Sequence, residues 1–278
     1  MEAFAISLVV PNYNNSVYLR KCVESAVQQS YPIKQIIIVD DKSTDESAEV
    51  IRALEKEYTN VKGVFLEKNG GVSNARNVGL SFTETEYVTF MDADDYYCNK
   101  DKIRNEMRLI QAYAFKNVDI LAYSYTVLAD NFGIPYENEF NSVHLKNEFI
   151  IGKSFCQLVS NTKTKRIPRD YIIKKSILLD VGAYSFYKNL YEDLDLLMRI
   201  AKRDIPFYCT FKSGTCYRNS ICGLSKQNKK ILQETEKEVF ELYYSDMSPK
   251  EKIKVFFWKI MGFFIKVQYR ARCFVRKK

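Results

Sequence analysis

The sequence has one histidine, no paired-cysteine motif and no long apolar run. His144 alone cannot supply a multi-histidine zinc site, and no serine or cysteine triad is evident near it. The seven cysteines include no Cys-x-x-Cys pair, and Glu2 and Asn12 interrupt the first apolar stretch, so no secretory signal is recognised. We therefore expect reduced thiols and a cytoplasmic protein.

Two common phosphate-binding motifs are also missing. The chain contains no Gly-x-Gly-x-x-Gly, and Gly152-Lys153-Ser154 is not a Walker A motif because Asn147 occupies the position of its first glycine. Any phosphate chemistry must therefore use another arrangement of residues.

Length and composition describe an ordinary folded protein. The 278 residues are 46% hydrophobic, 27% charged and 14% aromatic, which excludes a disordered chain and allows one large domain or a domain with an appendage. The formal net charge of +8 leaves phosphorylated ligands, nucleic acid and an anionic membrane open as partners.

Strand and helix patterns alternate along the first hundred residues. Continuous apolar runs at 4–10 and 35–39 predict strands buried on both faces, and each is followed by residues at helical spacing. Ser16 is placed to cap the first helix, and Ser43 or Thr44 the second. This βαβ order predicts a mostly parallel sheet, in which ligands bind beyond the carboxyl ends of the strands.

The later elements are less regularly spaced. We expect strands at 64–67 and 118–125, helices at 103–115 and 151–159, a strand and short helix within 169–179, and a loop or hairpin over the site at 128–147.

Polar loops stand at three of the predicted strand ends. They are Asn12-Tyr13-Asn14, Asp40-Asp41, and the acidic cluster of Asp92, Asp94 and Asp95 that follows a strand at 87–91. Three convergent polar loops indicate a binding site, whereas a solvated turn with an Asp helix cap would explain the acidic cluster taken alone. Hard carboxylate oxygens of this kind suit Mg²⁺ or Mn²⁺.

A fourth loop carries two glycines and leads to an arginine. Gly70 and Gly71 let the backbone approach a ligand closely, and the helix that follows offers free N–H groups to an anion. Arg76 adds a planar fork suited to phosphate or to a base edge.

Glu192 and Asp193 fall at the start of a predicted helix whose apolar face includes Leu194, Leu197 and Ile200. The helix dipole favours carboxylates in the first turn by about 0.3–1 kcal/mol, which is one explanation for the pair. The alternative is a general base at the mouth of the site.

Four motifs of the first hundred residues stand in a fixed order. They are Val-Pro-Asn-Tyr-Asn (10–14), Ile-Val-Asp-Asp-Lys-Ser-Thr-Asp (38–45), Asn-Gly-Gly-Val-Ser-Asn-Ala-Arg-Asn-Val-Gly (69–79) and Phe-Met-Asp-Ala-Asp-Asp (90–95). With Tyr-Glu-Asp (191–193), Cys-Tyr-Arg (216–218) and Leu-Ser (224–225), they resemble glycosyltransferase family 2, the inverting enzymes of the GT-A fold.

The resemblance implies an α/β GT-A fold, a three-layer α/β/α arrangement with a mostly parallel central sheet, plus a C-terminal helical segment. The expected catalytic domain is 1–225, with a nucleotide-binding half at 1–100 and an acceptor half at 101–225. The expected tail, 226–278, is helical, basic and amphipathic.

The resemblance also implies roles for particular residues. Nucleotide-sugar contacts are expected at Pro11, Tyr13, Asp40 or Asp41, Arg76, Asp92, Arg218 and Ser225, with Tyr13 stacking on the base. Asp92 and Asp94 would hold Mn²⁺ or Mg²⁺, and Asp193 would be the general base. An acidic partner for the base favours uracil, hence a UDP-sugar, and a hexosyl- or N-acetylhexosaminyltransferase acting on a glycan or lipid-linked oligosaccharide in surface polysaccharide synthesis.

From Pro249 the composition changes to aliphatic and aromatic residues at helical spacing with lysine and arginine between them. Lys259 interrupts the longest apolar stretch, which is too short for a spanning helix of about 20 residues. The pattern is typical of a helix lying in a membrane interface; the alternative is packing on its own domain or on a second subunit of a homodimer. We expect peripheral attachment to the cytoplasmic face of a membrane.

Two other functions fit parts of this sequence. A nucleotidyltransferase also places acidic metal ligands at the ends of parallel strands, but its glycine- and lysine-rich entry loop is missing here. A non-catalytic scaffold that binds anionic ligands or a membrane is the other alternative. Nucleic acid is not an expected partner, because the basic residues concentrate in the tail while the strand ends are acidic.

Overall fold

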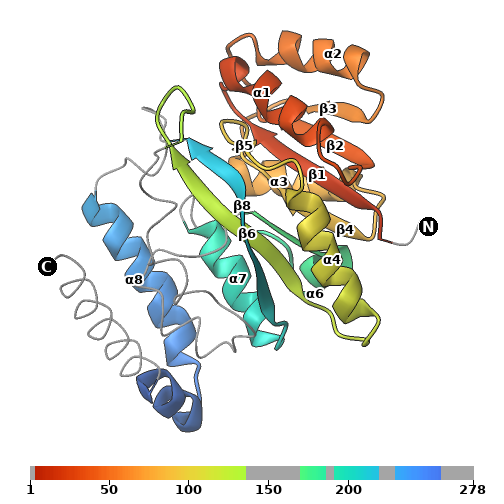
Figure 1. The fold of residues 1–278 in the computed structure, drawn as a ribbon. Helices are drawn as coiled ribbons and strands as arrows, with labels where there is room; N and C mark the ends of the chain where they lie inside the picture. Colours follow the sequence, from red (N-terminus) through yellow and green to blue (C-terminus); the bar gives the residue numbers. More distant parts are fainter. Residues whose placement is uncertain (1–3, 136–169, 186–190, 219–228, 258–278) are drawn as a thin grey trace, which may run out of the picture.

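Strands and helices alternate along the chain, of which the computed structural model describes residues 4–135, 170–185, 191–218 and 229–257 (Figure 1). The strands are β1 (Ile6–Asn12), β2 (Gln35–Asp40), β3 (Val61–Phe65), β4 (Tyr87–Phe90), β5 (Tyr96–Tyr97), β6 (Leu121–Ala129), β7 (Tyr171–Lys174) and β8 (Phe207–Arg218). The helices are α1 (Ser16–Val27), α2 (Ser47–Glu57), α3 (Val72–Phe82), α4 (Lys102–Ala114), α6 (Lys175–Asp180), α7 (Glu192–Lys202) and α8 (Lys229–Ser245).

The described strands form one sheet in the order β3-β2-β1-β4-β7-β6-β8-β5. Strands β3, β2, β1 and β4 are parallel, as the βαβ order of the first ninety residues predicts. β7 is antiparallel to both β4 and β6, β6 and β8 are parallel, and β5 is antiparallel to β8. The sheet is therefore mixed, with its parallel half in the nucleotide-binding half expected from the sequence.

Helices cover both faces of this sheet (Figure 1). On one face α1, α2 and α4 pack against alternate strand positions such as Leu8 and Ile36. On the other face α3, α6 and α7 pack against the intervening positions, including Val9 and Val88, and α8 joins the same core cluster from beside α7. Because side chains alternate between the faces of a strand, strands apolar at every position are what a sheet between two helical layers requires. The three-layer prediction is confirmed.

Residue 79 shows why α3 lies so close to the sheet. A Cβ atom at Gly79 would lie 2.3 Å from Cγ1 of Val9 on β1 and 3.1 Å from Cγ2 of Val39 on β2. Real Cβ atoms do not approach so closely, so only glycine lets α3 pack at this distance from both strands. The close packing fixes the first turn of α3 over the carboxyl ends of β1 and β2.

Several sequence predictions differ from the structure at the ends of elements. The predicted caps Ser16, Ser43 and Thr44 are wrong, because neither α1 nor α2 has a side-chain cap bond at its N-cap residue. Asp45 serves both helices instead: its Oδ2 accepts the backbone N–H of Ser16 at 2.9 Å and its Oδ1 that of Ser47 at 3.0 Å. Strand β8 was not predicted from the sequence.

Some predictions lie outside the described residues. They are the helix at 151–159, all of the loop at 128–147 beyond residue 135, and the domain boundary at 225.

Helix α8 packs beside α7, where the hydroxyl of Tyr243 donates to Oδ1 of Asp195 at 2.6 Å (Figure 1). A further helical stretch begins at residue 249. Among the helices that the structure describes, none has the length and apolar character needed to cross a bilayer.

Candidate active site

The carboxyl ends of β1 and β2 are tied together by Asp40. Its Oδ1 accepts hydrogen bonds from Nδ2 of Asn12 at 2.8 Å and from the hydroxyl of Ser43 at 2.5 Å, and its Oδ2 accepts the Ser43 N–H at 3.1 Å. The carboxylate is buried and lies level with Asn12 in the parallel register. Asp40 therefore orders the loop that carries Tyr13.

Asp41 fixes the glycine loop in the same way. Its two carboxylate oxygens accept the backbone N–H groups of Gly70 and Gly71 at 2.8 and 2.7 Å. Gly71 has φ +84°, a conformation that costs a residue with a side chain, and it immediately precedes α3. A carboxylate can accept about four hydrogen bonds, so Asp41 keeps capacity for a ligand donor. Which of Asp40 and Asp41 meets a base stays a prediction.

Tyr13 and Pro11 differ in exposure. The Tyr13 side chain is 48% exposed beyond the end of β1, whereas Pro11 is buried within the strand. An exposed ring held by an ordered loop suits base stacking, which is worth about 1–3 kcal/mol per base.

The acidic cluster forms as the sequence predicts. Asp92, Asp94 and Asp95 each offer a carboxylate oxygen, and these oxygens all lie within 4.8 Å of one another. Asp95 is buried and its Oδ1 accepts the backbone N–H of Arg218 at 2.9 Å, whereas Asp92 and Asp94 are partly exposed. Burial raises the pKa of the neighbouring Cys22 thiol, and the three carboxylates raise it further. Carboxylates so close together repel one another, and their oxygen donors fit Mg²⁺ or Mn²⁺.

Arg218 is the last residue of β8, and it contacts the acidic cluster at Asp94 and Asp95. Its Nε donates to the carbonyl of Asp94 at 2.9 Å, and Nη1 donates to the carbonyl of Asn131 at 3.1 Å. The guanidinium lies 4.5 Å above the ring of Tyr18 and is buried. Arg218 thus lies beside the proposed metal ligands. Its expected contact with the diphosphate stays a prediction. Ser225, its expected companion, lies outside the described residues.

Arg76 connects the acidic cluster to helix α7. Its Nη2 pairs with Oδ1 of Asp92 at 2.7 Å, and its Nη1 pairs with Oε1 of Glu192 at 2.7 Å and Oδ1 of Asp193 at 3.4 Å. Burial disfavours the charged guanidinium, but these carboxylates outweigh it and raise the pKa of Arg76 well above its ordinary value. The structure thus brings the expected metal ligand and the expected base to one arginine.

Glu192 is the residue that sequence reasoning left without a role in the site. It begins α7 together with Asp193, after Tyr191 in a left-handed conformation with φ +65°. Its side chain is 12% exposed, against 29% for Asp193. The sequence offered two signals for Glu192, its place in the Tyr-Glu-Asp motif and its position beside Asp193, and the helix dipole explains the second equally well.

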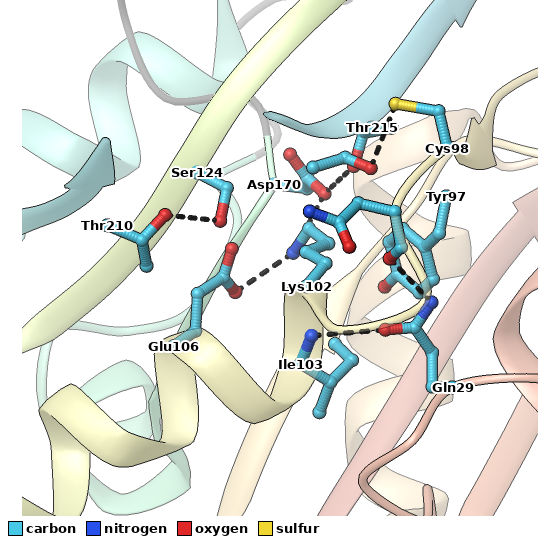
Figure 2. A network of polar contacts seen from close by, with 12 residues as sticks. Gln29, Tyr97, Cys98, Lys102, Ile103, Glu106, Ser124, Asp170, Thr210 and Thr215 are labelled. Atoms are coloured by element: carbon cyan, nitrogen blue, oxygen red, sulfur yellow. Dashed lines mark hydrogen bonds and ion pairs between the residues drawn. The ribbon is translucent and has the colours of Figure 1, made fainter. Parts of the chain in front are cut away.

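A buried polar network lies next to the cluster and was not predicted (Figure 2). Nζ of Lys102, on α4, pairs with Oε2 of Glu106 at 2.9 Å and with Oδ2 of Asp170 at 3.1 Å, and Lys102 and Glu106 are fully buried. Thr215 on β8 donates to Asp170. A small cavity connects the two regions; it is lined by Arg76, Phe90, Met91, Asp92, Asp95, Thr126, Asp170 and Thr215.

This network makes stability depend on pH through Glu106. Burial raises the pKa of Glu106 to about 7; the Lys102 ammonium opposes the shift and the Asp170 carboxylate adds to it. The folded protein then holds a proton that the unfolded chain releases above about pH 4.5, so the free energy of unfolding falls as pH rises from 4.5 to 7. Glu106→Gln removes this dependence on pH. From pH 4.5 to 7 the free energy of unfolding of wild type should therefore fall by about 1–3 kcal/mol relative to that of the variant.

Urea unfolding at pH 5, 6, 7 and 8 would measure the difference. Glu241→Gln, which alters an exposed side chain paired with Lys237, is the matched control. Its free energy of unfolding should change with pH as that of wild type does. If the free energy of unfolding of Glu106→Gln changed with pH as that of wild type does, Glu106 would not be the cause of the pH dependence.

Comparison with known proteins identifies the family. Residues 7–172 match the family model of Glycosyl transferase family 2. TuaG, a putative teichuronic acid biosynthesis glycosyltransferase of Bacillus subtilis (strain 168), is 32% identical over 149 residues, covering 52% of this chain and 58% of that protein. The chain spans little more than half the length of the curated relatives it matches first.

Two solved structures share the fold. S. aureus TarS 1-349 in complex with UDP-GlcNAc has a TM-score of 0.62 at 22% identity, covering 90% of this chain and 69% of that chain. The mannosyltransferase PcManGT from Pyrobaculum calidifontis, in complex with GDP-Man and Mn²⁺, has a TM-score of 0.64 at 14% identity, covering 91% of this chain and 68% of that chain. The predicted GT-A fold is confirmed, and with the family match over residues 7–172 the chain belongs to glycosyl transferase family 2.

Proposed function

We propose that the protein is a metal-dependent, inverting glycosyltransferase that moves a hexosyl or N-acetylhexosaminyl group from a UDP-sugar to a hydroxyl of a glycan or lipid-linked acceptor. The observation that carries the proposal is the acidic cluster at the carboxyl edge of the sheet, joined by Arg76 to Asp193 at the start of α7. The carboxylates to which we assign the donor side and the acceptor side thus contact the same arginine.

The base is proposed to lie between Tyr13 and the loop held by Asp41. Tyr13 stacks on its face and Pro11 supports the strand end below. Asp41, or Asp40, accepts the N–H of uracil, while Arg218 and Ser225 hold the diphosphate. The loops that carry Tyr13 and Gly70 are already fixed by hydrogen bonds, so little ordering is needed on binding.

Asp92 and Asp94 would hold Mn²⁺ or Mg²⁺, because their oxygens are the hard donors that these ions prefer. When bound, the ion supplies Lewis-acid stabilisation of the negative charge that develops on the departing diphosphate. Asp95 also has a structural role, since its Oδ1 accepts the Arg218 N–H and so fixes the backbone of the cluster.

Asp193 is proposed to remove the proton from the acceptor hydroxyl as its oxygen attacks the anomeric carbon. The new C–O bond forms as the bond to the diphosphate breaks, so a single displacement inverts the anomeric configuration. A positioned base of this kind typically contributes about 10²–10⁴-fold. UDP complexes of S. aureus TarS and the teichuronic acid connection of TuaG support the donor class and a role in surface polysaccharide synthesis.

The test is calorimetric binding of UDP, GDP and their sugars to the purified protein, with and without Mn²⁺. UDP binding that requires the metal, with release of UDP rather than pyrophosphate on turnover, supports the proposal. Release of pyrophosphate would favour the nucleotidyltransferase alternative, and binding of nucleotide without any turnover the scaffold alternative.

We also propose that the helical stretch beginning at residue 249 lies on an anionic membrane surface. Ile253, Phe256 and Phe257 are 69%, 65% and 58% exposed, and lysines at 250, 252 and 254 accompany them. Exposed apolar side chains beside basic ones suit an interface where each lysine contributes about 1 kcal/mol near anionic lipid.

Vesicle flotation measures this attachment. Wild type should float with phosphatidylcholine vesicles that contain phosphatidylserine, and less with vesicles that lack it. Changing Phe256 and Phe257 together to serine should abolish flotation, whereas Phe115→Ser, which alters an aromatic that is 81% exposed beyond α4, should not. A concentration-dependent dimer that these two substitutions dissociate, without flotation, would overturn the membrane assignment.

A further inference from the structure

Arg76 joins two parts of the site that lie far apart in the sequence. It stands on α3, sixteen residues before Asp92 and 116 before Glu192, and its side chain contacts both. We propose that Arg76 is a positioning residue, which with Glu192 sets the place of Asp193 relative to the acidic cluster. This inference deepens the proposed function and rests on it.

The contacts of Arg76 are arranged on two sides of one guanidinium. Nη2 is directed at Asp92 and Nη1 at Glu192 and Asp193, with two of the three nitrogen–oxygen distances at 2.7 Å. A planar fork makes such two-sided contact possible, whereas a lysine ammonium is a single point of charge on a flexible stem. The bridge therefore needs arginine, not only a positive charge.

The guanidinium is also held in place by its surroundings. It is 4% exposed, and its centre lies 5.0 Å above the ring of Tyr184. The next residue of α3, Asn77, exchanges hydrogen bonds with the Tyr184 backbone: Nδ2 donates to the carbonyl at 2.8 Å, and Oδ1 accepts the N–H at 2.9 Å. A rigid helix and a fixed segment thus confine the Arg76 side chain, as a positioning residue requires.

This placement separates two roles for Arg76. The sequence resemblance expects it to contact the nucleotide, yet Nη1 and Nη2 both face protein carboxylates at hydrogen-bond distance. A nucleotide ligand would govern the affinity for UDP. A residue that positions the base would govern turnover, because displacing a reacting group by about 1 Å can cost about 10²-fold.

The experiment compares Arg76→Gln, Arg76→Lys and Glu192→Gln with wild type, each with Asp193 intact. UDP binding with Mn²⁺ is measured by calorimetry, and turnover as UDP release from the UDP-sugar that binds best, with water as acceptor. Arg76→Gln should lower kcat by about 10–100-fold with a much smaller change in the dissociation constant for UDP. Arg76→Lys should fall between Arg76→Gln and wild type.

The dependence of kcat on pH is a second measurement, which a purely structural role of Arg76 would leave unchanged. Removing the positive charge of Arg76 favours the protonated form of Asp193, so the acid limb of kcat should move to higher pH in Arg76→Gln. Removing the negative charge of Glu192 should move it to lower pH. Arg199→Gln is the control, since Arg199 pairs with Asp195 on the same helix at 2.7 Å and contacts neither Asp193 nor the cluster; it should lose stability but keep the profile.

Two results would overturn the positioning role. One is weakened UDP binding in Arg76→Gln with kcat unchanged, which would make Arg76 a nucleotide ligand. The other is kcat and pH profiles like those of Arg199→Gln, which would make it structural. Failure of wild type itself to bind UDP with Mn²⁺ and release it from a UDP-sugar would instead reject the proposed function.

Discussion

Asp193→Asn is expected to lower turnover of the nucleotide-sugar by about 10²–10⁴-fold. The dissociation constant for UDP should be nearly unchanged, because the proposed proton transfer to Asp193 takes place only in the transition state. Asparagine has almost the same shape and its amide oxygen still faces Arg76, so the geometry of the α7 start is preserved. What is lost is the capacity to take a proton.

Hydrolysis of the donor makes this test independent of the acceptor. Water replaces the acceptor hydroxyl, and it too must lose a proton as it attacks the anomeric carbon, so UDP release reports on Asp193. The measurement is the initial rate of UDP release at saturating donor, alongside calorimetric binding of UDP with Mn²⁺.

Asp195→Asn is the matched control, two residues further along the first turn of α7. Asp195 shares the helix dipole with Asp193, but its carboxylate accepts from Tyr243 at 2.6 Å, Ser185 at 2.7 Å and Arg199 at 2.7 Å. Although burial raises its pKa, these hydrogen bonds outweigh burial and hold the pKa of Asp195 below its ordinary value. Asp195→Asn should cost about 1–3 kcal/mol of stability and leave turnover per folded molecule intact.

The pair of variants separates the two explanations of the acidic helix start. If the carboxylates serve only the helix dipole, both substitutions lower stability and neither lowers kcat specifically. If Asp193 is the base, only its substitution lowers kcat. Turnover that survives Asp193→Asn would reject the base assignment.

The first ninety residues could be predicted because their signals are local. Apolar runs that end in polar loops define β1, β2 and β4, and parallel pairing then brings Asn12, Asp40 and the segment after Phe90 to one edge. Nothing beyond strand length and the βαβ rule is needed to place the acidic cluster there.

Strand β8 illustrates where local signals fail. Its residues alternate irregularly between buried and exposed, Phe211 has φ +57°, and its register against β6 shifts twice. A bulged strand does not keep the period of two by which strands are recognised. Arg218 was singled out only by its resemblance to a motif, not by the strand that positions it.

The network around Lys102 could not be predicted for a different reason. Lys102 lies in the run Asn99-Lys100-Asp101-Lys102, which is typical of a solvated helix start. Its burial follows from β6, β7 and β8 packing over α4, and its partner Asp170 is distant in the sequence. The bridge from Arg76 to Glu192 spans 116 residues and is equally invisible to local pattern. Long-range ion pairs are properties of the packed fold.

Asp94→Asn is expected to have opposite effects on UDP binding with and without metal. With Mn²⁺, losing one of the two proposed ligands should weaken UDP binding by at least about 10-fold, since changes to groups beyond the ligands themselves already cost about 10–100-fold in metal affinity. Without metal, the sign should reverse. Asp92, Asp94 and Asp95 lie within 4.8 Å of one another and repel a diphosphate, so removing one charge should tighten binding slightly.

This reversal distinguishes a metal site from a solvated acidic turn. A turn that holds no ion would give only the second effect, a slight gain in UDP affinity at every Mn²⁺ concentration. Asp119→Asn, an exposed carboxylate that pairs with Lys174 at 3.5 Å, controls for the change in net charge and should leave both titrations as in wild type. Calorimetric UDP titrations at zero and saturating Mn²⁺ would decide the matter. If Asp94→Asn bound UDP as wild type does with Mn²⁺ present, Asp94 would not be a metal ligand, and the carboxylates of Asp92 and Asp95 would have to hold the ion alone.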